Sequence, residues 1–312
     1  MERKNETTAM DFILLGLFPG MEHIDIIISI IFLIYIIAIT GNVILIFLIW
    51  VDSHLHTPMY ILLSQLSLID MAFISTVVPK MVIDFFSGKK GISHLGCGSQ
   101  MFFSLMLGGA ECILITLMAY DRFVAVCNPL RYVVIMNYSV CLQMVVGSWI
   151  GGALNSLVQT IYTMHFHFCS SREINYFFCE VMAVLKLSCE DTSTYEMGIL
   201  MAGIVFVLIP LGLILTSYIL IFLSVLHMNS PEGRNKALAT CSSHLTVVSL
   251  YFGPGIFIYM MPRSSQILKL NKILSVFCTI LTPMLNPLIY SLRNKDMIEA
   301  LRRFLERFGG SK

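Results

Sequence analysis

Residues 26–50 of the chain read IIISIIFLIYIIAITGNVILIFLIW, a run without one charged side chain. A helix that crosses the hydrocarbon core of a bilayer needs about 20 mostly apolar residues. The run has that length and that composition. It therefore predicts a membrane-spanning helix and decides the class of fold.

Six further segments have the same character, and they occupy residues 57–79, 97–120, 138–164, 197–226, 237–261 and 273–292. The whole composition agrees, because 57% of the residues are hydrophobic and only 12% are charged. We therefore expect an all-α membrane protein, a seven-transmembrane helix bundle. Its single domain, 1–312, divides into an extracellular N-terminus 1–25, the bundle 26–292 and a cytoplasmic tail 293–312.

The distribution of Lys and Arg does not orient the chain, because the 20 basic residues divide equally between the two sides. The glycosylation sequon at Asn5 favours an outside N-terminus, because such sequons are used only on secreted or extracellular segments. The charged first residues lack a small-residue cleavage site, so no removable signal peptide is expected. We predict a multi-pass protein of the plasma membrane.

Nine cysteines divide between the two sides of the predicted membrane. Four lie in or beside outer segments, where an even number suggests two disulfides, with three pairings open: Cys97, Cys169, Cys179 and Cys189. The other five are expected as free thiols within spans or on the cytosolic side: Cys112, Cys127, Cys141, Cys241 and Cys278.

The stretch Met118-Ala-Tyr-Asp-Arg-Phe-Val-Ala-Val-Cys-Asn128 ends the third span with an adjacent acid and base, Asp121 and Arg122. A charge at the bilayer centre costs about 2.5–3.5 kcal/mol on insertion scales, so a helix end is the less costly position. The Arg122 guanidinium can pair with Asp121 at rest and be released when the cytoplasmic face opens. This switch interpretation is favoured over a charge pair that only contacts lipid headgroups.

Asp70 and Glu111 are the two carboxylates inside the predicted spans. Intramembrane acids are functional hypotheses by default, because each must find a partner or take up a proton. Two neighbouring carboxylates share either a cation or a proton. A third alternative is hydrogen bonding between helices, and Asn42 belongs to the same polar network. Pro210 and Pro287 are expected to bend the fifth and seventh helices.

The motifs along nearly the whole chain resemble those of mammalian odorant receptors, within the rhodopsin-like G-protein-coupled receptors. They are Gly41-Asn42, Leu55-His-Thr-Pro-Met-Tyr60, Leu66-Ser67 with Asp70, Pro79-Lys80, Met118 to Tyr132, Ser217-Tyr218, Lys236-Ala, Thr240-Cys-Ser-Ser-His-Leu245 and Pro283-Met-Leu-Asn-Pro-Leu-Ile-Tyr-Ser-Leu-Arg-Asn294. The segment Leu107-Gly-Gly-Ala-Glu-Cys112 is similar to tetrapod-type receptors of odorant family 2. The resemblance implies odorant binding, coupling to the stimulatory olfactory G protein and a rise in cyclic AMP.

The resemblance also implies roles for single residues. Tyr218 and Tyr290 swing toward the cytoplasmic cavity on activation, although a Tyr near the interface is often only a belt residue. Lys236 and His244 lie on the helix that moves outward, and Asn286 and Pro287 lie where the seventh helix rearranges. A sodium ion is implied beside Asp70 and Asn286, with Glu111 near. The implied disulfides are Cys97–Cys179 and Cys169–Cys189.

The family binds its odorants in the extracellular half of the third, fifth, sixth and seventh helices. On the third helix the expected residues are Ser104, Leu105, Gly108 and Gly109, where the glycines either leave room for a guest or allow close helix packing. Facing them we expect an apolar wall with a few hydroxyl groups: Phe206, Phe252, Gly255, Ile256, Tyr259 and Thr279. Ser104 stands where amine receptors carry an acid, and no Lys lies midway along the seventh helix to hold retinal. The expected ligand is a small, mostly apolar, uncharged volatile.

Other functions find less support in the sequence. The disulfide implied for Cys169 removes the thiol that, with His165 and His167, would otherwise suit copper or zinc, so no metal site is expected. The sequence contains no apparent nucleophile elbow or phosphate-binding loop, so it does not indicate an enzyme. Nothing in it points to a nucleic-acid partner. A transporter should show inverted repeats. A receptor for a metabolite outside the olfactory epithelium stays open.

Beyond Asn294 apolar residues recur at helical spacing among arginines, which is typical of a helix lying on the cytoplasmic leaflet with anionic lipid. The apolar residues are Met297, Ile298, Leu301, Phe304, Leu305 and Phe308, and the arginines are Arg302, Arg303 and Arg307.

Overall fold

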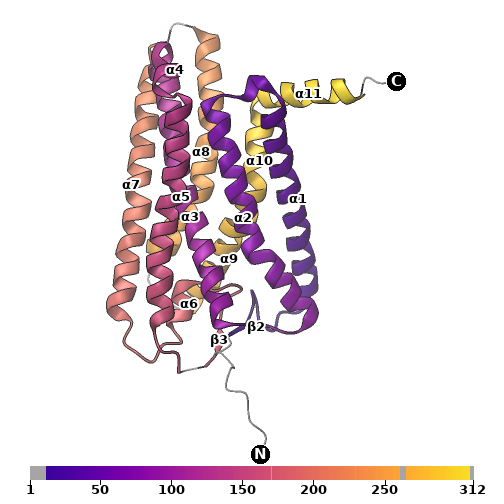
Figure 1. Ribbon diagram of the computed structural model, residues 1–312, viewed down its shortest axis with the longest axis vertical. Helices are drawn as coiled ribbons and strands as arrows, with labels where there is room; N and C mark the ends of the chain where they lie inside the picture. Colours follow the sequence, from indigo (N-terminus) through magenta and orange to yellow (C-terminus); the bar gives the residue numbers. More distant parts are fainter. Residues whose placement is uncertain (1–11, 170, 229, 261–264, 310–312) are drawn as a thin grey trace, which may run out of the picture.

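The computed structural model describes residues 12–169, 171–228, 230–260 and 265–309 (Figure 1). Asn5 lies outside these residues, and the side chains of Lys236, Tyr259, Arg307 and Phe308 are also outside what the structure describes. The long helices run side by side along the longest axis of the molecule, and α11 lies across one end (Figure 1). The small strands lie at the opposite end.

The predicted seven-helix bundle is confirmed. Its first six long helices are α1 (Ile24–Val51), α2 (Pro58–Ser87), α3 (His94–Cys127), α5 (Tyr138–His165), α7 (Ser193–Leu226) and α8 (Pro231–Met260). The seventh consists of α9 (Ser265–Val276), a π-helical segment η3 (Phe277–Leu281) and α10 (Thr282–Arg293). Among the described residues six stretches are long and apolar enough to cross a membrane. The one long helix outside that set is α8, which carries polar residues such as Ser243 and His244.

Short elements connect these helices: η1 (Ser53–Leu55), η2 (Pro129–Arg131), α4 (Tyr132–Ile135) and α6 (Val181–Leu185). A further helix, α11 (Lys295–Gly309), follows α10. Several long helices extend past the predicted spans. Pro79, the predicted end of the second span, lies inside α2, and Pro254 lies inside α8, as Pro210 and Pro287 do in their helices. A membrane helix tolerates an internal proline because neighbouring groups satisfy the freed carbonyl.

A three-stranded sheet covers part of the outer end, and the sequence did not predict it. Strand β1 (Phe12–Leu14) lies between β2 (Gly91–Ile92), to which it is antiparallel, and β3 (Glu173–Ile174), to which it is parallel. Strands of two or three residues are too short to produce a recognisable alternation of apolar and polar side chains. The sheet nevertheless joins the N-terminal segment to two outer loops.

Covalent and polar bonds fasten the same outer layer. Both disulfides implied by the family resemblance are present, Cys97–Cys179 and Cys169–Cys189. The Gln100 side chain accepts a hydrogen bond from the Cys179 backbone N–H at 2.9 Å and donates one to the Thr76 carbonyl at 3.0 Å. The long loop is therefore fixed to α3 and α2.

The seventh helix contributes Lys272 to this layer. Its Nζ donates to the carbonyl oxygens of Gly16 and Leu17, at 3.1 and 3.2 Å, and to Oδ1 of Asn175 at 2.8 Å. This lysine is only 4% exposed. One buried ammonium thus holds the N-terminal segment, the long loop and α9 together.

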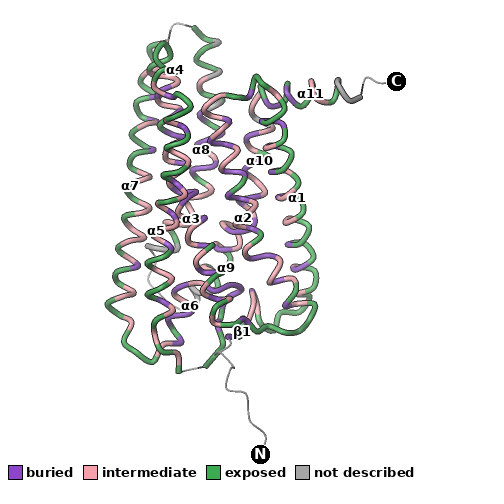
Figure 2. Tube along the Cα trace, in the orientation of Figure 1, coloured by how far each residue is buried: buried purple, intermediate pink, exposed green. Residues whose placement is uncertain are grey.

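Burial is distributed as expected for a bundle in lipid. Purple, buried segments concentrate on the inner faces, whereas α1, α5 and α7 show long green, exposed stretches (Figure 2). The exposed side chains on these helices include Leu33, Leu154 and Leu213, with exposed fractions of 59%, 60% and 56%. Large apolar side chains that face outward along whole helices indicate contact with lipid tails.

The central contact of the bundle lies between α3 and α5, where backbones approach closely. The ideal Cβ position of Gly109 is 3.1 Å from the Gly152 Cα. A Cβ on Gly152 would lie 2.3 Å from the Met106 carbonyl oxygen and 2.7 Å from the Ala110 nitrogen. Small residues at such a crossing maximise van der Waals contact between membrane helices.

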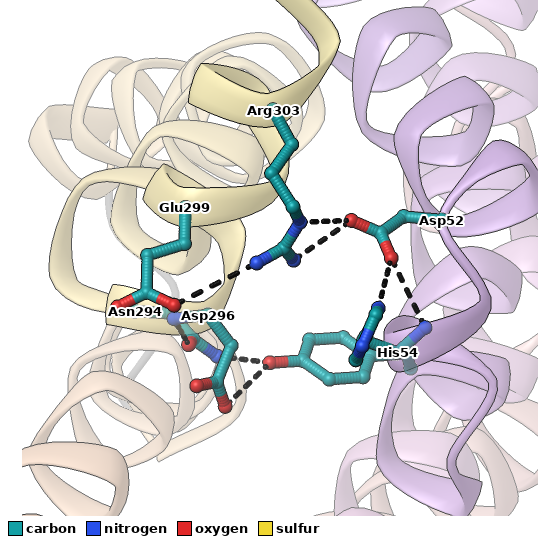
Figure 3. Close-up of polar contacts among 7 residues, drawn as sticks. Asp52, His54, Asn294, Asp296, Glu299 and Arg303 are labelled. Carbon is teal, nitrogen blue, oxygen red and sulfur yellow. Dashed lines mark hydrogen bonds and ion pairs between the residues drawn. The ribbon is translucent and has the colours of Figure 1, made fainter.

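The predicted C-terminal helix is present as α11, and a polar network attaches it to η1 (Figure 3). Nη2 and Nε of Arg303 donate to Oδ2 of Asp52 at 2.8 and 3.0 Å. Burial tends to raise the pKa of Asp52, but hydrogen bonds from Arg303 and His54 outweigh it and lower the pKa from 3.8 to about 2. The ionised carboxylate therefore contributes to stability above pH 4, and this contribution is lost as the pH falls through about 2.

Hydrogen bonds to Tyr60 of α2 hold the beginning of α11. Asn294 donates to the Tyr60 hydroxyl at 3.0 Å, and that hydroxyl donates to Asp296 Oδ2 at 3.3 Å (Figure 3). Further along, the Phe304 ring packs edge-on against Phe47, with centroids 5.5 Å apart. One face of the amphipathic helix α11 thus contacts α1 and α2.

We predict that Gly152→Ala lowers the thermal stability of the purified protein, because the added methyl group meets backbone atoms of α3 that cannot rotate away. Overpacking of this kind costs about 1–3 kcal/mol. The measurement is the midpoint of thermal unfolding in detergent. Gly147→Ala is the matched control, since nothing lies within 4 Å of the Cβ position of Gly147 on the same helix. Equal midpoints for the two variants would contradict the prediction.

Candidate functional site

Three groups of polar residues follow one another along the bundle, and the first lies at the cytoplasmic end of α3. Nη2 of Arg122 is 3.3 Å from Oδ2 of Asp121, so the predicted ion pair is closed in this structure. The Tyr132 hydroxyl of α4 donates to Oδ1 of Asp121 at 2.8 Å. Asp121 is 1% exposed. Both carboxylate oxygens of this buried acid therefore face a cationic or hydrogen-bonding group.

The neighbouring helices bring two of the predicted switch residues together. The Tyr218 hydroxyl on α7 is 2.7 Å from Nδ1 of His244 on α8, and both side chains are buried. The Tyr290 hydroxyl on α10 is buried and has no hydrogen-bond partner in the described part of the chain. Tyr218 and His244 thus join two helices, whereas Tyr290 keeps an unused hydroxyl.

The second group lies in the interior, between α1, α2, α3 and α10. Nδ2 of Asn286 donates to both oxygens of Asp70, at 3.2 and 3.0 Å. Nδ2 of Asn42 donates to the carbonyl oxygens of Ala38 and Pro283, both at 2.9 Å. Glu111 is 2% exposed and close enough to Asp70 for their charges to interact. Asn42, Asp70, Glu111 and Asn286 are therefore all buried inside the bundle.

Some oxygen atoms in this interior remain without a partner. Oδ1 of Asn42, Oδ1 of Asn286 and Oε1 of Glu111 are buried and accept no hydrogen bond within the described residues. Buried polar atoms normally find partners, so each exception requires an explanation. Amide and carboxylate oxygens are acceptors that also suit a hard cation.

The third group surrounds the outer half of α3. The Ser104 hydroxyl donates to the Gln100 carbonyl at 2.7 Å, one turn earlier on the same helix. The Cβ position of Gly108 meets open space. The Tyr251 hydroxyl of α8 donates to the Gly108 carbonyl at 2.6 Å. Gly108 therefore combines free volume with a hydrogen-bonded aromatic neighbour, as a small-molecule site needs.

The other predicted ligand residues whose side chains are described differ in their surroundings. Gly109 contacts Gly152, so the structure gives it the close-packing role that the sequence left open. Phe252 and Thr279 are buried, and the Cβ position of Gly255 meets open space. The others, which are half-buried, are Leu105, Phe206 and Ile256.

Two tyrosines of these groups were given no role by sequence reasoning. Tyr132 closes the motif that begins at Met118, and Tyr251 directly precedes Phe252. A tyrosine in a membrane helix is more often an interfacial residue than a site residue, so only its contacts distinguish the two. A buried Tyr hydroxyl usually needs a hydrogen-bond partner. This requirement is the one feature of the sequence that could have pointed to Tyr132 and Tyr251.

The histidines of the long loop do not form a metal centre in this structure. The Cys169 sulfur is committed to a disulfide, and Nδ1 of His167 is 2.5 Å from Oε1 of Glu190. The hydrogen bond from His167 lowers the pKa of the exposed Glu190 carboxyl. Within the described residues no group of three His, Cys, Asp or Glu side chains could hold a metal ion.

Comparison with known proteins gives a consistent result. The family model described as olfactory receptor matches residues 31–307. Human olfactory receptor 2T1 is 53% identical over 310 residues, covering 99% of this chain and 84% of that protein. Human olfactory receptor 2T2 is 54% identical over 302 residues, with 97% and 93% covered. Human olfactory receptor 2L3 is 49% identical over 312 residues and aligns over the whole of both chains.

We predict that Asn286→Leu lowers thermal stability, because the buried Asp70 carboxylate loses both hydrogen bonds from the amide. An unsatisfied buried acceptor costs about 1–3 kcal/mol, and more when it is charged. The measurement is again the unfolding midpoint in detergent. Thr216→Val is the control, since Thr216 is exposed and, within the described residues, its hydroxyl bonds only to the Gly212 carbonyl of its own helix. An unchanged midpoint in Asn286→Leu would contradict the role given to the pair.

Proposed function

The chain belongs to the olfactory receptor family, and from this premise we propose that it responds to small, mostly apolar volatiles by activating the stimulatory, olfactory-type G protein and raising cyclic AMP. Membership of the family establishes the general function directly. The protein is an odorant receptor, a multi-pass protein of the plasma membrane and a signalling receptor coupled to a G protein, and it is not an enzyme.

The observation that carries the ligand proposal is the open space at Gly108 beside the Tyr251 hydroxyl. The other residues proposed to line the site, Phe252, Gly255 and Thr279, add few polar groups and no charge. Such a lining favours a ligand held by apolar burial, worth about 0.8 kcal/mol per methylene, with one or two hydrogen bonds. Ser104 and Tyr251 supply the hydroxyl groups.

The closed Asp121–Arg122 pair supports the coupling proposal. We assign this structure to the resting arrangement, in which Tyr132 and Asp121 hold the cytoplasmic end of α3. Release of Arg122 would expose a guanidinium for the G protein, since this group forms strong bidentate hydrogen bonds with carboxylate groups. Movement of α8, which carries His244 and Lys236, would break the Tyr218–His244 bond.

We further propose that a sodium ion binds beside Asp70 in the resting state. The unpartnered oxygens of Asn42, Asn286 and Glu111 in the same interior support this, because a cation would satisfy acceptors that find no donor. Asp70 would supply the negative charge, and Asn286 would keep that carboxylate in place. The competing arrangement is a proton shared by Asp70 and Glu111.

We also propose that α11 lies on the cytoplasmic leaflet. Ile298, Leu301 and Leu305 are exposed, whereas Met297 and Ala300 face the protein. The exposed apolar side chains of α11 can therefore contact lipid tails, and its arginines can bind anionic headgroups.

The coupling proposal predicts a ligand-dependent rise in cyclic AMP in cells that express the chain with the olfactory-type stimulatory G protein, tested across a panel of volatiles. Arg122→Ala, matched for surface level, should abolish the rise because the exposed guanidinium is missing. Tyr132→Phe should raise basal cyclic AMP, because Asp121 loses one of its two partners. A response that persists in Arg122→Ala, or a response through calcium without cyclic AMP, would contradict the proposal.

The ligand site is tested with the volatile found in that panel. Gly108→Phe should raise the concentration needed for half-maximal response by at least about tenfold, since the ring occupies the proposed site and a displaced apolar group is worth about 1–3 kcal/mol. Gly147→Phe introduces the same ring at an exposed position of α5. Equal responses in both variants would place the odorant elsewhere.

The sodium proposal predicts a higher unfolding midpoint in NaCl than in N-methylglucamine chloride at equal ionic strength. A bound ion at ten times its Kd stabilises the folded state by about 1.4 kcal/mol. Asp70→Asn should remove the difference, whereas Asp25→Asn, at an exposed position near the start of α1, should keep it. A difference retained in Asp70→Asn would place the sodium effect away from Asp70 and contradict the proposal, and equal midpoints of the wild type in the two salts would favour the shared proton.

A further inference from the structure

A cavity lies at the outer end of the bundle, and none of the residues that line it belongs to the proposed odorant site. Its volume is about 290 Å³, and it lies between the N-terminal segment, the outer ends of α1 and α2, and Phe177 of the long loop. In Figure 1 these helix ends lie beside the small sheet. Its walls are mainly apolar and include Leu15, Leu17, Phe18, Met81 and Phe85.

Two charged residues line the cavity, Asp84 and Lys90. The Asp84 carboxylate is neutralised by an ion pair with Nζ of Lys80, which also donates to the Gly91 carbonyl at 2.9 Å. The Lys90 ammonium pairs with no carboxylate in the described part of the chain. The charges of Asp84, Lys80 and Lys90 sum to one positive charge, so this end of the cavity favours an anion.

The volume limits the size of the occupant. A water molecule takes about 30 Å³ of liquid volume, so 290 Å³ corresponds to about ten non-hydrogen atoms. Pockets for small ligands begin at about 300 Å³, which puts this cavity at the lower end of the range. A carboxylate on a chain of about eight carbons has the required size, the apolar body and the negative end.

We propose that this cavity is a second binding site of the receptor, and that it takes a medium-chain carboxylate with its head at Lys90 and its chain against Leu17, Met81 and Phe85. Gly16 and Leu17, which line the cavity, are also the residues whose carbonyls accept hydrogen bonds from Lys272. An occupant therefore touches the segment that is fastened to the seventh helix. The site is independent of the odorant proposed above and of the G protein.

Binding of radiolabelled octanoate to the purified full chain in phosphatidylcholine nanodiscs tests the proposal. In competition, affinity should rise about fourfold per methylene from butanoate to octanoate, the factor that corresponds to about 0.8 kcal/mol. It should not rise further at dodecanoate, which exceeds the volume. An affinity that keeps rising through dodecanoate would indicate partition into lipid and overturn the proposal. Octan-1-ol should bind more weakly than octanoate.

Substitutions locate the site. Lys90→Gln should weaken octanoate binding by about three- to tenfold, the range for a partly exposed ion pair with a hydrogen bond, and should leave octan-1-ol unaffected. Lys89→Gln is the matched control, an adjacent exposed lysine that does not line the cavity. Equal affinities for the wild type and Lys90→Gln, or an equal loss in Lys89→Gln, would overturn the proposal.

A third variant distinguishes the cavity from the proposed odorant site. Gly108→Phe fills the proposed odorant site and should leave octanoate affinity unchanged. A loss of octanoate binding in Gly108→Phe, with Lys90→Gln unaffected, would move the carboxylate to the odorant site and overturn the assignment. The unfolding midpoint of each variant, measured in the same nanodiscs, identifies any loss that comes from misfolding.

Discussion

The spanning helices have no water to satisfy their polar groups, so each polar side chain must find its partner inside the bundle. Apolar burial alone does not select helix neighbours here, because lipid tails are as apolar as leucine. The bonds from Asn286 to Asp70, from Asn42 to the Pro283 carbonyl and between Tyr218 and His244 each cross from one helix to another. These contacts determine how the helices are rotated, and the site depends on that rotation.

Helix α3 connects the layers of the receptor. Its outer end carries the Cys97–Cys179 disulfide, its middle passes the polar interior at Glu111, and its cytoplasmic end carries Asp121. Gly108 and Asp121 are about 20 Å apart along this helix at 1.5 Å per residue. Gly152 lets α5 pack closely against the middle of α3. Buried polar atoms without a hydrogen bond lie on α3 itself, at Glu111, and on the surrounding helices, at residues such as Tyr290.

Much of the fold could be predicted from the sequence because a run of about 20 apolar residues has few alternatives to a membrane helix. The disulfide pairing came from family resemblance, since four cysteines alone allow three pairings. The outer sheet, the π-helical segment Phe277–Leu281 and the contact from Tyr251 to Gly108 were not predicted. Each depends on residues far apart in the chain or on a backbone detail without a periodic signal.

The sequence by itself determined that the chain crosses the membrane, roughly where each span lies and which few side chains carry charge within it. Only the tertiary structure decided which way each side chain faces. Gly108 and Gly109 are neighbours in sequence, yet the first meets open space and the second meets Gly152. In lipid both faces of a helix are apolar, so the pattern of hydrophobic residues does not distinguish inside from outside. Packing against the other helices makes that choice.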